Sequence, residues 1–373
     1  MFLALLELRA ARGRFLLMGS VVVLVAALVG IVSGFTTGLG DDTISALRRL
    51  PASQFVFSSD ARSDQFARSL LDERTAAAWR KDADTDMTPL GVSITRGTTN
   101  RGAEVDLAAF GVEPESFLSP SVTQGDDLAD ASADSIVMSA GLADEGVRVG
   151  DTLVIDRLGI KLHVIGLTER SAYGHVPAAY VPLRTWQRIR FSAPGSQASA
   201  ATEIPDQFSA LALRTPAKVS TADLDERHST TTLTKEKAYE AAPGYTGERV
   251  TMNSIQVFLY LIAPLVVGAF FAVWTVQRQP ELALLRALGA SRRQLLAHTV
   301  LQAALVVVLG TVAGAVLAGA VGLLVGEQVP FSLPATTLAV TMCTVAAVGL
   351  AGTALTLRRV TAADPLTMLG ANR

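Results

Sequence analysis

The stretch "RQPELALLRALGASRRQL", residues 278–295, lies between two long apolar runs. It carries four arginines and one glutamate, whereas the flanking runs Ile255–Val276 and Val300–Val325 contain no charged residue. A helix needs roughly 20 apolar residues to cross the hydrocarbon core of a bilayer. The charged stretch therefore separates two segments that are each long enough to span a membrane.

Two further apolar runs of similar length occur at Phe15–Phe35 and Leu338–Leu357. Half of the 373 residues are hydrophobic and only 18% are charged. Soluble globular proteins are nearer about 25% charged. The formal net charge of −2 argues against a nucleic-acid partner, which requires a basic surface. The composition therefore indicates a membrane protein with membrane lipid as its surroundings.

Basic residues in short flanks predict the orientation of the spans. The loop after the third span carries Glu327 and no lysine or arginine. The other three flanks are basic: Arg9, Arg12, Arg14; Arg278, Arg286, Arg292, Arg293; and Arg358, Arg359. We expect a multi-pass protein of the plasma membrane with both termini cytoplasmic, and a large external domain over Thr36–Asn253.

The external segment has the patterns of both strands and helices. Alternating or β-branched runs bounded by Gly, Pro and Asp predict strands at 54–59, 87–94, 103–112, 151–168 and 208–214. Apolar residues at helical spacing predict a helix over 64–81. The expected fold is an α+β membrane protein with four transmembrane helices, one plus three, and a large mixed α/β extracellular domain between the first and second.

Three parts of the chain follow from this pattern. Residues 1–35 form a cytoplasmic amphipathic segment and the first span, and residues 36–253 form the extracellular domain. Residues 254–373 hold the second to fourth spans, with a cytoplasmic helix at 280–289.

Sequence motifs for catalysis are absent. No G-x-x-x-x-G-K-[ST] phosphate loop occurs, and G-x-S-x-G does not occur around Ser139. The histidines are scattered, and Cys343 is the single cysteine, so neither a zinc site nor an intramolecular disulfide is expected. We expect no catalytic residue, no metal site, no cofactor of the chain's own and no enzymatic activity.

Small residues recur every four positions in two of the spans. The third span has Gly310, Gly314, Ala318 and Gly322, and the first has Ala26, Gly30 and Gly34. Such ridges let two helices approach closely. The spacing is compatible with packing inside one chain and with self-association.

The stretch quoted above has the features of a short helix at 280–289. Pro280 suits a helix start, Glu281 complements the positive helix end, and Gly289 is a natural stop. Leu282, Leu285 and Leu288 form one apolar stripe. By itself the pattern fits an interfacial anchor as well as a docking surface.

Four parts of the chain resemble one family. "ELALLRALGASRRQL" (281–295) is similar to the cytoplasmic signature of the FtsX-like, or MacB-type, permeases, the membrane subunits of ABC exporters. "LALLELRAARGRFLLMGSVVVLVAAL" (3–28), "MSAGLADEGVRVGDTLVI" (138–155) and "TAADPLTMLG" (361–370) resemble its opening segment, an external phrase and its closing segment.

The resemblance implies a homodimer bound to two copies of a separate ATPase subunit, which binds ATP and Mg. The cytoplasmic helix would couple closure of the ATPases to movement of the spans. Carried over to this sequence, the ATPase-coupling residues are Glu281, Leu282, Leu285, Arg286, Leu288 and Gly289.

The overall likeness is greatest to the branch of haem exporters, HrtB-like, which implies haem as a transported ligand. An iron ligand must be His, Met, Tyr, Cys or a carboxylate. Met252, Glu248 and Tyr245 lie at the outer end of the second span, and Arg249 could pair with a propionate. No histidine is expected at this depth, because His228 is two dozen residues away.

Each of these residues also has a structural reading: Tyr245 as an interfacial anchor, Glu248 with Arg249 as a solvated pair, and Met252 as ordinary packing. Two other functions stay open. One is export of another hydrophobic or amphiphilic compound such as an antibiotic, peptide or lipoprotein. The other is FtsX-like mechanical transmission to an external protein.

We predict that Leu285→Asp leaves the chain inserted in the membrane and abolishes its stimulation of the partner ATPase. A charge on the apolar stripe removes the surface that the ATPase would contact. Co-purification of the two subunits and ATPase assays in liposomes measure this effect. Wild-type yield of the complex with unchanged stimulation would contradict it.

Overall fold

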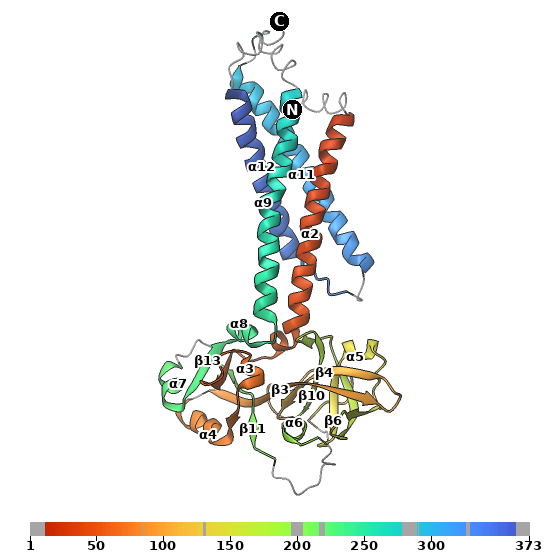
Figure 1. The fold of residues 1–373 in the computed structure, drawn as a ribbon, viewed down its shortest axis with the longest axis vertical. Coiled ribbons are helices and arrows are strands. Elements are labelled where there is room, and N and C mark those ends of the chain that lie inside the picture. The colour runs from red at the N-terminus through yellow and green to blue at the C-terminus, as the bar shows by residue number, and fades with distance from the viewer. Residues whose placement is uncertain are drawn as a thin grey trace. The chain divides into compact units, whose positions relative to one another are not determined.

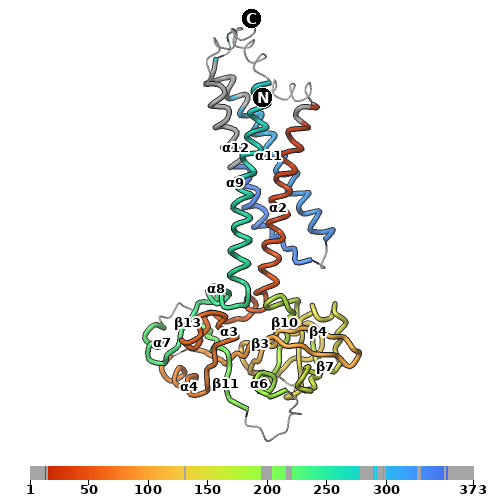
Figure 2. The backbone as a smooth tube through the Cα atoms, in the orientation of Figure 1, coloured from red at the N-terminus to blue at the C-terminus, as the bar shows by residue number. Residues whose placement is uncertain are grey.

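The structure is a computed structural model that describes residues 12–83, 85–129, 132–194, 204–215, 221–277, 289, 291–325 and 329–362. Its contacts divide the chain into two units. Gly40–Arg249 form one, which we call the sheet domain, and Met1–Leu39 with Val250–Arg373 form the other, the helix unit. Figures 1 and 2 show the elements of each.

Within the described residues, three helical segments are long and apolar enough to cross a membrane: Leu16–Arg49, Tyr245–Gln277 and Val300–Val325. They lie in α2 (Arg12–Arg49), α9 (Tyr245–Gln277) and α11 (Arg292–Val325). The fourth predicted span lies in α12 (Ala335–Ala362), of which the apolar part Ala335–Ala347 is shorter. α2 and α9 are longer than the predicted spans and continue into the sheet domain.

The small-residue ridges of α2 and α11 pack against each other within the chain. A Cβ added to Gly310 would lie 2.7 Å from Val22, and one added to Gly314 would lie 2.6 Å from Ala26. One added to Gly30 would lie 2.8 Å from Ala318. Real Cβ atoms do not approach this closely, so the helices depend on these small residues for their contact. The ridges therefore serve packing inside one chain.

The sheet domain contains an 11-stranded sheet and a two-stranded one. The helices that accompany them are short: α3 (Gln65–Arg68), α4 (Glu73–Asp82), α5 (Ala140–Asp144), α6 (Leu183–Phe191), α7 (Ala222–His228), α8 (Lys235–Ala238) and the 3-10 turn Tyr239–Ala241. The strands are β1 (Gln54–Ser58), β2 (Leu71–Asp72), β3 (Asp86–Thr99), β4 (Glu104–Val112), β5 (Val122–Gly125), β6 (Ser135–Ser139), β7 (Thr152–Ile155), β8 (Lys161–Thr168), β9 (Ala172–Tyr173), β10 (Val176–Pro182), β11 (Gln207–Phe208), β12 (Ala210–Arg214) and β13 (Thr230–Thr234).

Six of these strands pair in a closed ring. β3 pairs with β4, β4 with β10, β10 with β6, β6 with β8, β8 with β7, and β7 returns to β3. The first residues of β3 also pair with β12, which continues through β1 to β13. The domain is therefore a small barrel and an open sheet that share β3 (Figure 1).

Alternating residues of the ring strands form one buried cluster. They include Leu107 and Ala109 of β4, Ile136 and Met138 of β6, Leu153 and Ile155 of β7, and Leu162 and Val164 of β8. Their alternate neighbours, such as Phe110 of β4 and Tyr180 of β10, join a second cluster with Phe55 and Phe57 of β1. Both faces of strands such as β4 and β10 are thus buried, which explains their continuous apolar sequence.

The predicted helix over 64–81 is divided in two, and this prediction was wrong at its centre. α3 and α4 are separated by β2, which pairs with β11. The Asp72 carboxylate accepts a hydrogen bond from the Thr75 backbone N–H at 2.9 Å and begins α4 there. That hydrogen bond lowers the pKa of Asp72. Helical spacing continues through the break, so periodicity alone does not reveal it.

The Trp186 side chain of α6 is fully buried and lies against two glycines of the sheet. A Cβ on Gly91 of β3 would come within 2.2 Å of its ring, and a Cβ on Gly111 of β4 within 2.4 Å of its Cβ. The indole Nε1–H donates to Ser93 Oγ at 3.0 Å. The missing side chains create the space that α6 occupies.

We predict that Gly111→Ala destabilises the full chain by about 1–3 kcal/mol, because the added methyl overpacks a filled core. Thermal unfolding in detergent, monitored by proteolysis of the sheet domain, measures the loss of stability. Gly141→Ala is the matched control, since a Cβ there has its nearest neighbour at an ordinary 3.6 Å. Equal stability of the two variants would contradict the prediction.

Candidate functional site

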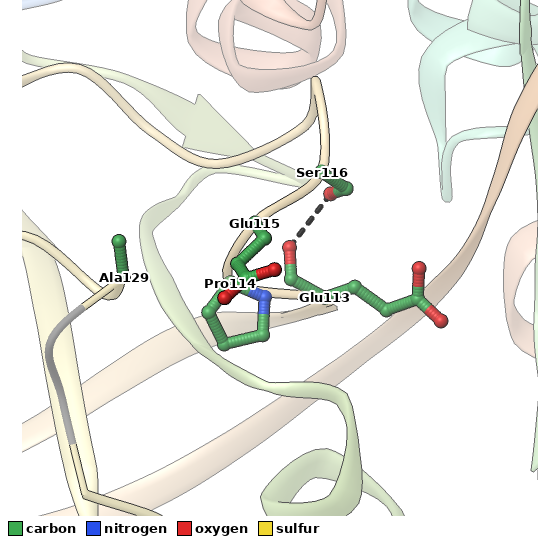
Figure 3. Close-up of a pocket in the computed structure, with 5 residues that line it drawn as sticks. All are labelled: Glu113, Pro114, Glu115, Ser116 and Ala129. Atoms are coloured by element: carbon green, nitrogen blue, oxygen red, sulfur yellow. Dashed lines mark hydrogen bonds between the residues drawn. The ribbon is translucent and has the colours of Figure 1, made fainter.

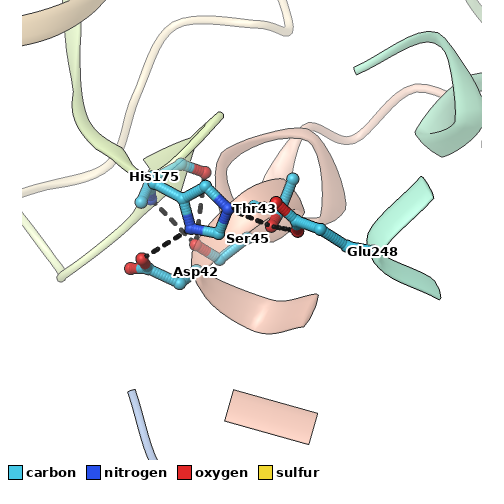
Figure 4. A network of polar contacts seen from close by, with 6 residues as sticks. Asp42, Thr43, Ser45, His175 and Glu248 are labelled. Carbon is cyan, nitrogen blue, oxygen red and sulfur yellow. Dashed lines mark hydrogen bonds and ion pairs between the residues drawn. The ribbon is translucent and has the colours of Figure 1, made fainter. Parts of the chain in front are cut away.

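The residues predicted to bind a ligand lie on the first turns of α9. Tyr245, Glu248 and Arg249 are in the sheet domain, and Met252 is in the helix unit. The structure brings Glu248 to residues of two distant segments, the C-terminal part of α2 and the turn between β9 and β10. These contacts define the candidate site, which we name the His175 junction: Asp42, Thr43, Ser45, His175 and Glu248 (Figure 4).

His175 is positioned by a two-residue hairpin turn. β9 and β10 pair with Tyr173 opposite Val176, so Gly174 and His175 form the loop. Both have positive φ, 60° and 67°, as a type I′ turn requires. The turn is held to α2, because the Gly174 N–H donates to the Thr43 carbonyl at 2.9 Å.

Both ring nitrogens of His175 face a carboxylate (Figure 4). His175 Nε2 lies 2.6 Å from Glu248 Oε1, and Nδ1 lies 3.2 Å from Asp42 Oδ2. Thr43 Oγ1 donates to Glu248 Oε2 at 3.0 Å. Ionised carboxylates only accept hydrogen bonds, so this arrangement favours the doubly protonated imidazolium.

Opposing effects act on the pKa of His175. Burial lowers it, while the hydrogen bonds to Glu248 and Asp42 and their negative charge raise it, and the net shift is upward. The His175 side chain is 39% exposed, so water screens these interactions and each ion pair contributes modestly. The junction is a charge-assisted contact at the domain surface.

Ser45 adds a second connection between α2 and the hairpin. Its Oγ donates to the Ala172 carbonyl at 3.3 Å and accepts from the Ala172 N–H at 2.8 Å. The neighbouring Arg49 pairs with Glu169. The last turns of α2 are therefore bonded at several points to the strand end that presents His175.

The other predicted ligand residues have different surroundings. Arg249 pairs with Glu240 at 2.9 Å, and its guanidinium lies 5.9 Å from the centre of the Tyr245 ring. Tyr245 packs on a buried cluster of the sheet domain. Met252 is half-buried one turn along α9 from Glu248. Glu248 is thus paired with His175 and Thr43, rather than with Arg249 as the sequence suggested.

The expectation that no histidine lies near these residues was wrong. His175 is 73 positions from Glu248 in the sequence, and only the pairing of β9 with β10 brings them together. Gly-His between two short apolar runs is a weak hairpin signal. It predicts the turn, but it gives no indication of what the turn contacts.

Other candidate sites in the described residues are weaker. The residues that the structure describes contain no group of three His, Cys, Asp or Glu side chains that could hold a metal ion. A shallow hollow of about 430 Å³ is lined by Glu113, Pro114, Glu115, Ser116 and Ala129 (Figure 3). Ser116 Oγ donates to the Glu113 carbonyl there, which is the pattern of a local turn.

Most of the predicted coupling helix lies outside the described residues, namely Glu281, Leu282, Leu285, Arg286 and Leu288. Gly289 is described, exposed, and has a φ of 101°. This conformation is the one that glycine adopts at the end of a helix.

Comparisons with known proteins find one family match over part of the chain and several distant relatives. Residues 253–365 match the FtsX-like permease C-terminal family. The chain is 22% identical to the hemin transport system permease protein HrtB, so named, of Staphylococcus haemolyticus, over 99% of each chain. It is 25% identical to an uncharacterized ABC transporter permease of Mycobacterium bovis, over 74% of this chain and 72% of that one.

Two solved structures resemble part of this chain distantly. The periplasmic region of MacB from Actinobacillus actinomycetemcomitans matches with a TM-score of 0.36 at 13% identity, covering 52% of this chain and 92% of that one. The extracellular domain of the transporter YknZ matches with a TM-score of 0.34 at 12% identity, covering 49% and 98%. The family match over residues 253–365, by itself, confirms the predicted resemblance to FtsX-like permeases in the C-terminal part of the chain.

We predict that the stability added by His175 depends on pH. Because folding raises its pKa, this stability is fully present below the ordinary value of 6.5 and is lost as pH rises through the raised pKa. His175→Asn, which tolerates the positive φ, should cost about 0.2–1 kcal/mol at about pH 6 and less at about pH 9. Unfolding of both chains at the two pH values measures the difference. His163→Asn, at an exposed histidine that contacts the Thr152 hydroxyl, controls for loss of a surface imidazole, and an equal cost of His175→Asn at both pH values would refute the prediction.

Proposed function

We propose that this chain is the membrane permease subunit of an ABC-type exporter and that it couples ATP hydrolysis by a separate ATPase subunit to efflux. The observation that carries the proposal is similarity to permeases along 99% of the chain, together with the FtsX-like match over residues 253–365. The three long apolar helices are consistent with a membrane subunit.

The proposed assembly is a homodimer with two ATPase subunits in the plasma membrane, both termini being cytoplasmic. The ATPase would contact the helix predicted at 280–289, and ATP with Mg would be bound by the partner. α2 supports mechanical coupling to the external domain. It is one helix over Arg12–Arg49, and its last turns are bonded to the hairpin that carries His175.

The proposed cargo is haem. Full-length relatives named for hemin transport motivate this choice. The start of α9 offers suitable donors, because carboxylate, thioether, phenol and imidazole groups all ligate haem iron. Glu248, Met252 and Tyr245 are the proposed haem-binding residues, with Arg249 as the partner of a propionate. If Glu248 binds iron through Oε2, which accepts a hydrogen bond from Thr43, its Oε1 keeps the hydrogen bond to His175.

The decisive experiment is a haemin titration of the purified, detergent-solubilised chain, followed in the Soret band. We expect a saturable shifted band that Glu248→Ala or Met252→Ala alters. His175→Asn should weaken binding by about 10-fold, because it removes a hydrogen-bond partner of the ligand. His228→Asn, which removes a histidine paired with Asp82 at 3.1 Å, should leave the band unchanged.

Two other results change the assignment in different ways. A saturable band that no variant alters keeps haem as cargo and excludes these ligand residues. Absence of a saturable band excludes haem. The ATPase activity of the complex, stimulated by another amphiphile, would then identify the compound that is exported.

A further inference from the structure

A buried polar contact joins α2 and α9 within the helix unit. The Gln256 side-chain Nε2 donates to Ser33 Oγ at 3.0 Å and to Tyr260 Oη at 3.1 Å. Ser33 is only 1% exposed, whereas Gln256 and Tyr260 are half-buried. We call these three residues the Gln256 cluster.

The cluster continues the inward face of α9. Ala263, Val267, Phe271 and Trp274 follow Tyr260 at helical spacing, and all are buried. Tyr260 and Gln256 occupy the same stripe, about one and two turns respectively before Ala263. The buried stripe is therefore apolar over most of its length and changes to polar side chains at one end.

Part of the hydrogen-bonding capacity of the cluster is unused. Gln256 spends both amide hydrogens on Ser33 and Tyr260, so its Oε1 has no partner among the described residues. Tyr260 Oη accepts a hydrogen bond there and still has a hydrogen to donate. In a membrane-spanning helix unsatisfied polar groups are costly. A molecule that both accepts and donates a hydrogen bond would satisfy them.

The surroundings select an uncharged group. Residues 16–40 of α2 and 250–277 of α9 contain no Asp, Glu, Lys, Arg or His. These two segments offer no cation to an anion at the cluster, which would also lose its hydration. A hydroxyl, an amide or a protonated carboxyl combines donor and acceptor without a charge.

We propose that Gln256 and Tyr260, with Ser33 behind them, bind the uncharged polar group of a membrane-soluble amphiphile. The site rests on the proposed function in one respect: its role is to let a permease recognise a molecule taken from the lipid. It is separate from the haem-binding residues proposed above, which are at the first turns of α9. Its ligand is defined by the hydroxyl, amide or protonated carboxyl and by an apolar tail.

Photolabelling tests the site. The purified full chain in phosphatidylcholine nanodiscs is exposed to a monoacylglycerol that carries a diazirine, and labelled peptides are identified by mass spectrometry. We expect saturable labelling of α9 in the wild type. Tyr260→Phe removes one hydroxyl. It should raise the probe concentration needed for half-saturation by roughly 3- to 10-fold, as expected for loss of one hydrogen bond in a membrane. Gln256→Leu should abolish saturation.

Ser254→Ala is the matched control, because Ser254 lies on the same part of α9, is exposed, and bonds to the Val250 carbonyl of its own helix. It should label like the wild type. Equal labelling of the wild type, Tyr260→Phe and Gln256→Leu would overturn the proposal. Saturable labelling that the variants lose, in a chain without a haemin Soret band, would establish the site and exclude haem.

Discussion

The backbone pairing of one strand holds the sheet domain together. β3 has 14 residues, and its two ends pair with different strands of the large sheet: Asp86–Leu90 pair with β12, while Gly97–Thr99 pair with β7. Its length lets one strand take part both in the closed ring and in the open sheet. Trp186 packs where β3 and β4 both lack a side chain. The position of α6 therefore follows from the same strand.

Much of this fold could be predicted from local sequence. Strands such as β1 and β4, and the turn from β10 into α6, follow from short runs of apolar and turn-forming residues. The break between α3 and α4 could not, because it depends on pairing of β2 with β11, a remote segment. The contact between His175 and Glu248 could not be predicted either, because it also joins segments that are remote in the sequence. Glu248 was singled out as a polar residue at the end of a span, yet its partner is selected by tertiary structure.

The helix ridges show a second limit of sequence reasoning. Gly310 and Gly314 at a spacing of four permit a close helix neighbour, whether it comes from the same chain or from another copy. The spacing is identical in both cases, so no pattern distinguishes them. The structure decides between them because Val22 and Ala26 of α2 occupy the space above these glycines. Any contact between two copies of this chain must therefore use other surfaces.

The polar residues of α9 follow a gradient that electrostatics explains. Glu248, at the first turn, is charged and faces His175, where exposure to water is still 39% for the imidazole. Gln256 and Tyr260, further along, are uncharged and bond to each other. Beyond them the buried stripe is apolar. Charge is tolerated only where a counter-charge and water are both present, and neutral hydrogen-bonding groups extend further into the apolar part of the helix. The buried or paired side chains along α9 therefore change from charged, through neutral and hydrogen-bonding, to apolar.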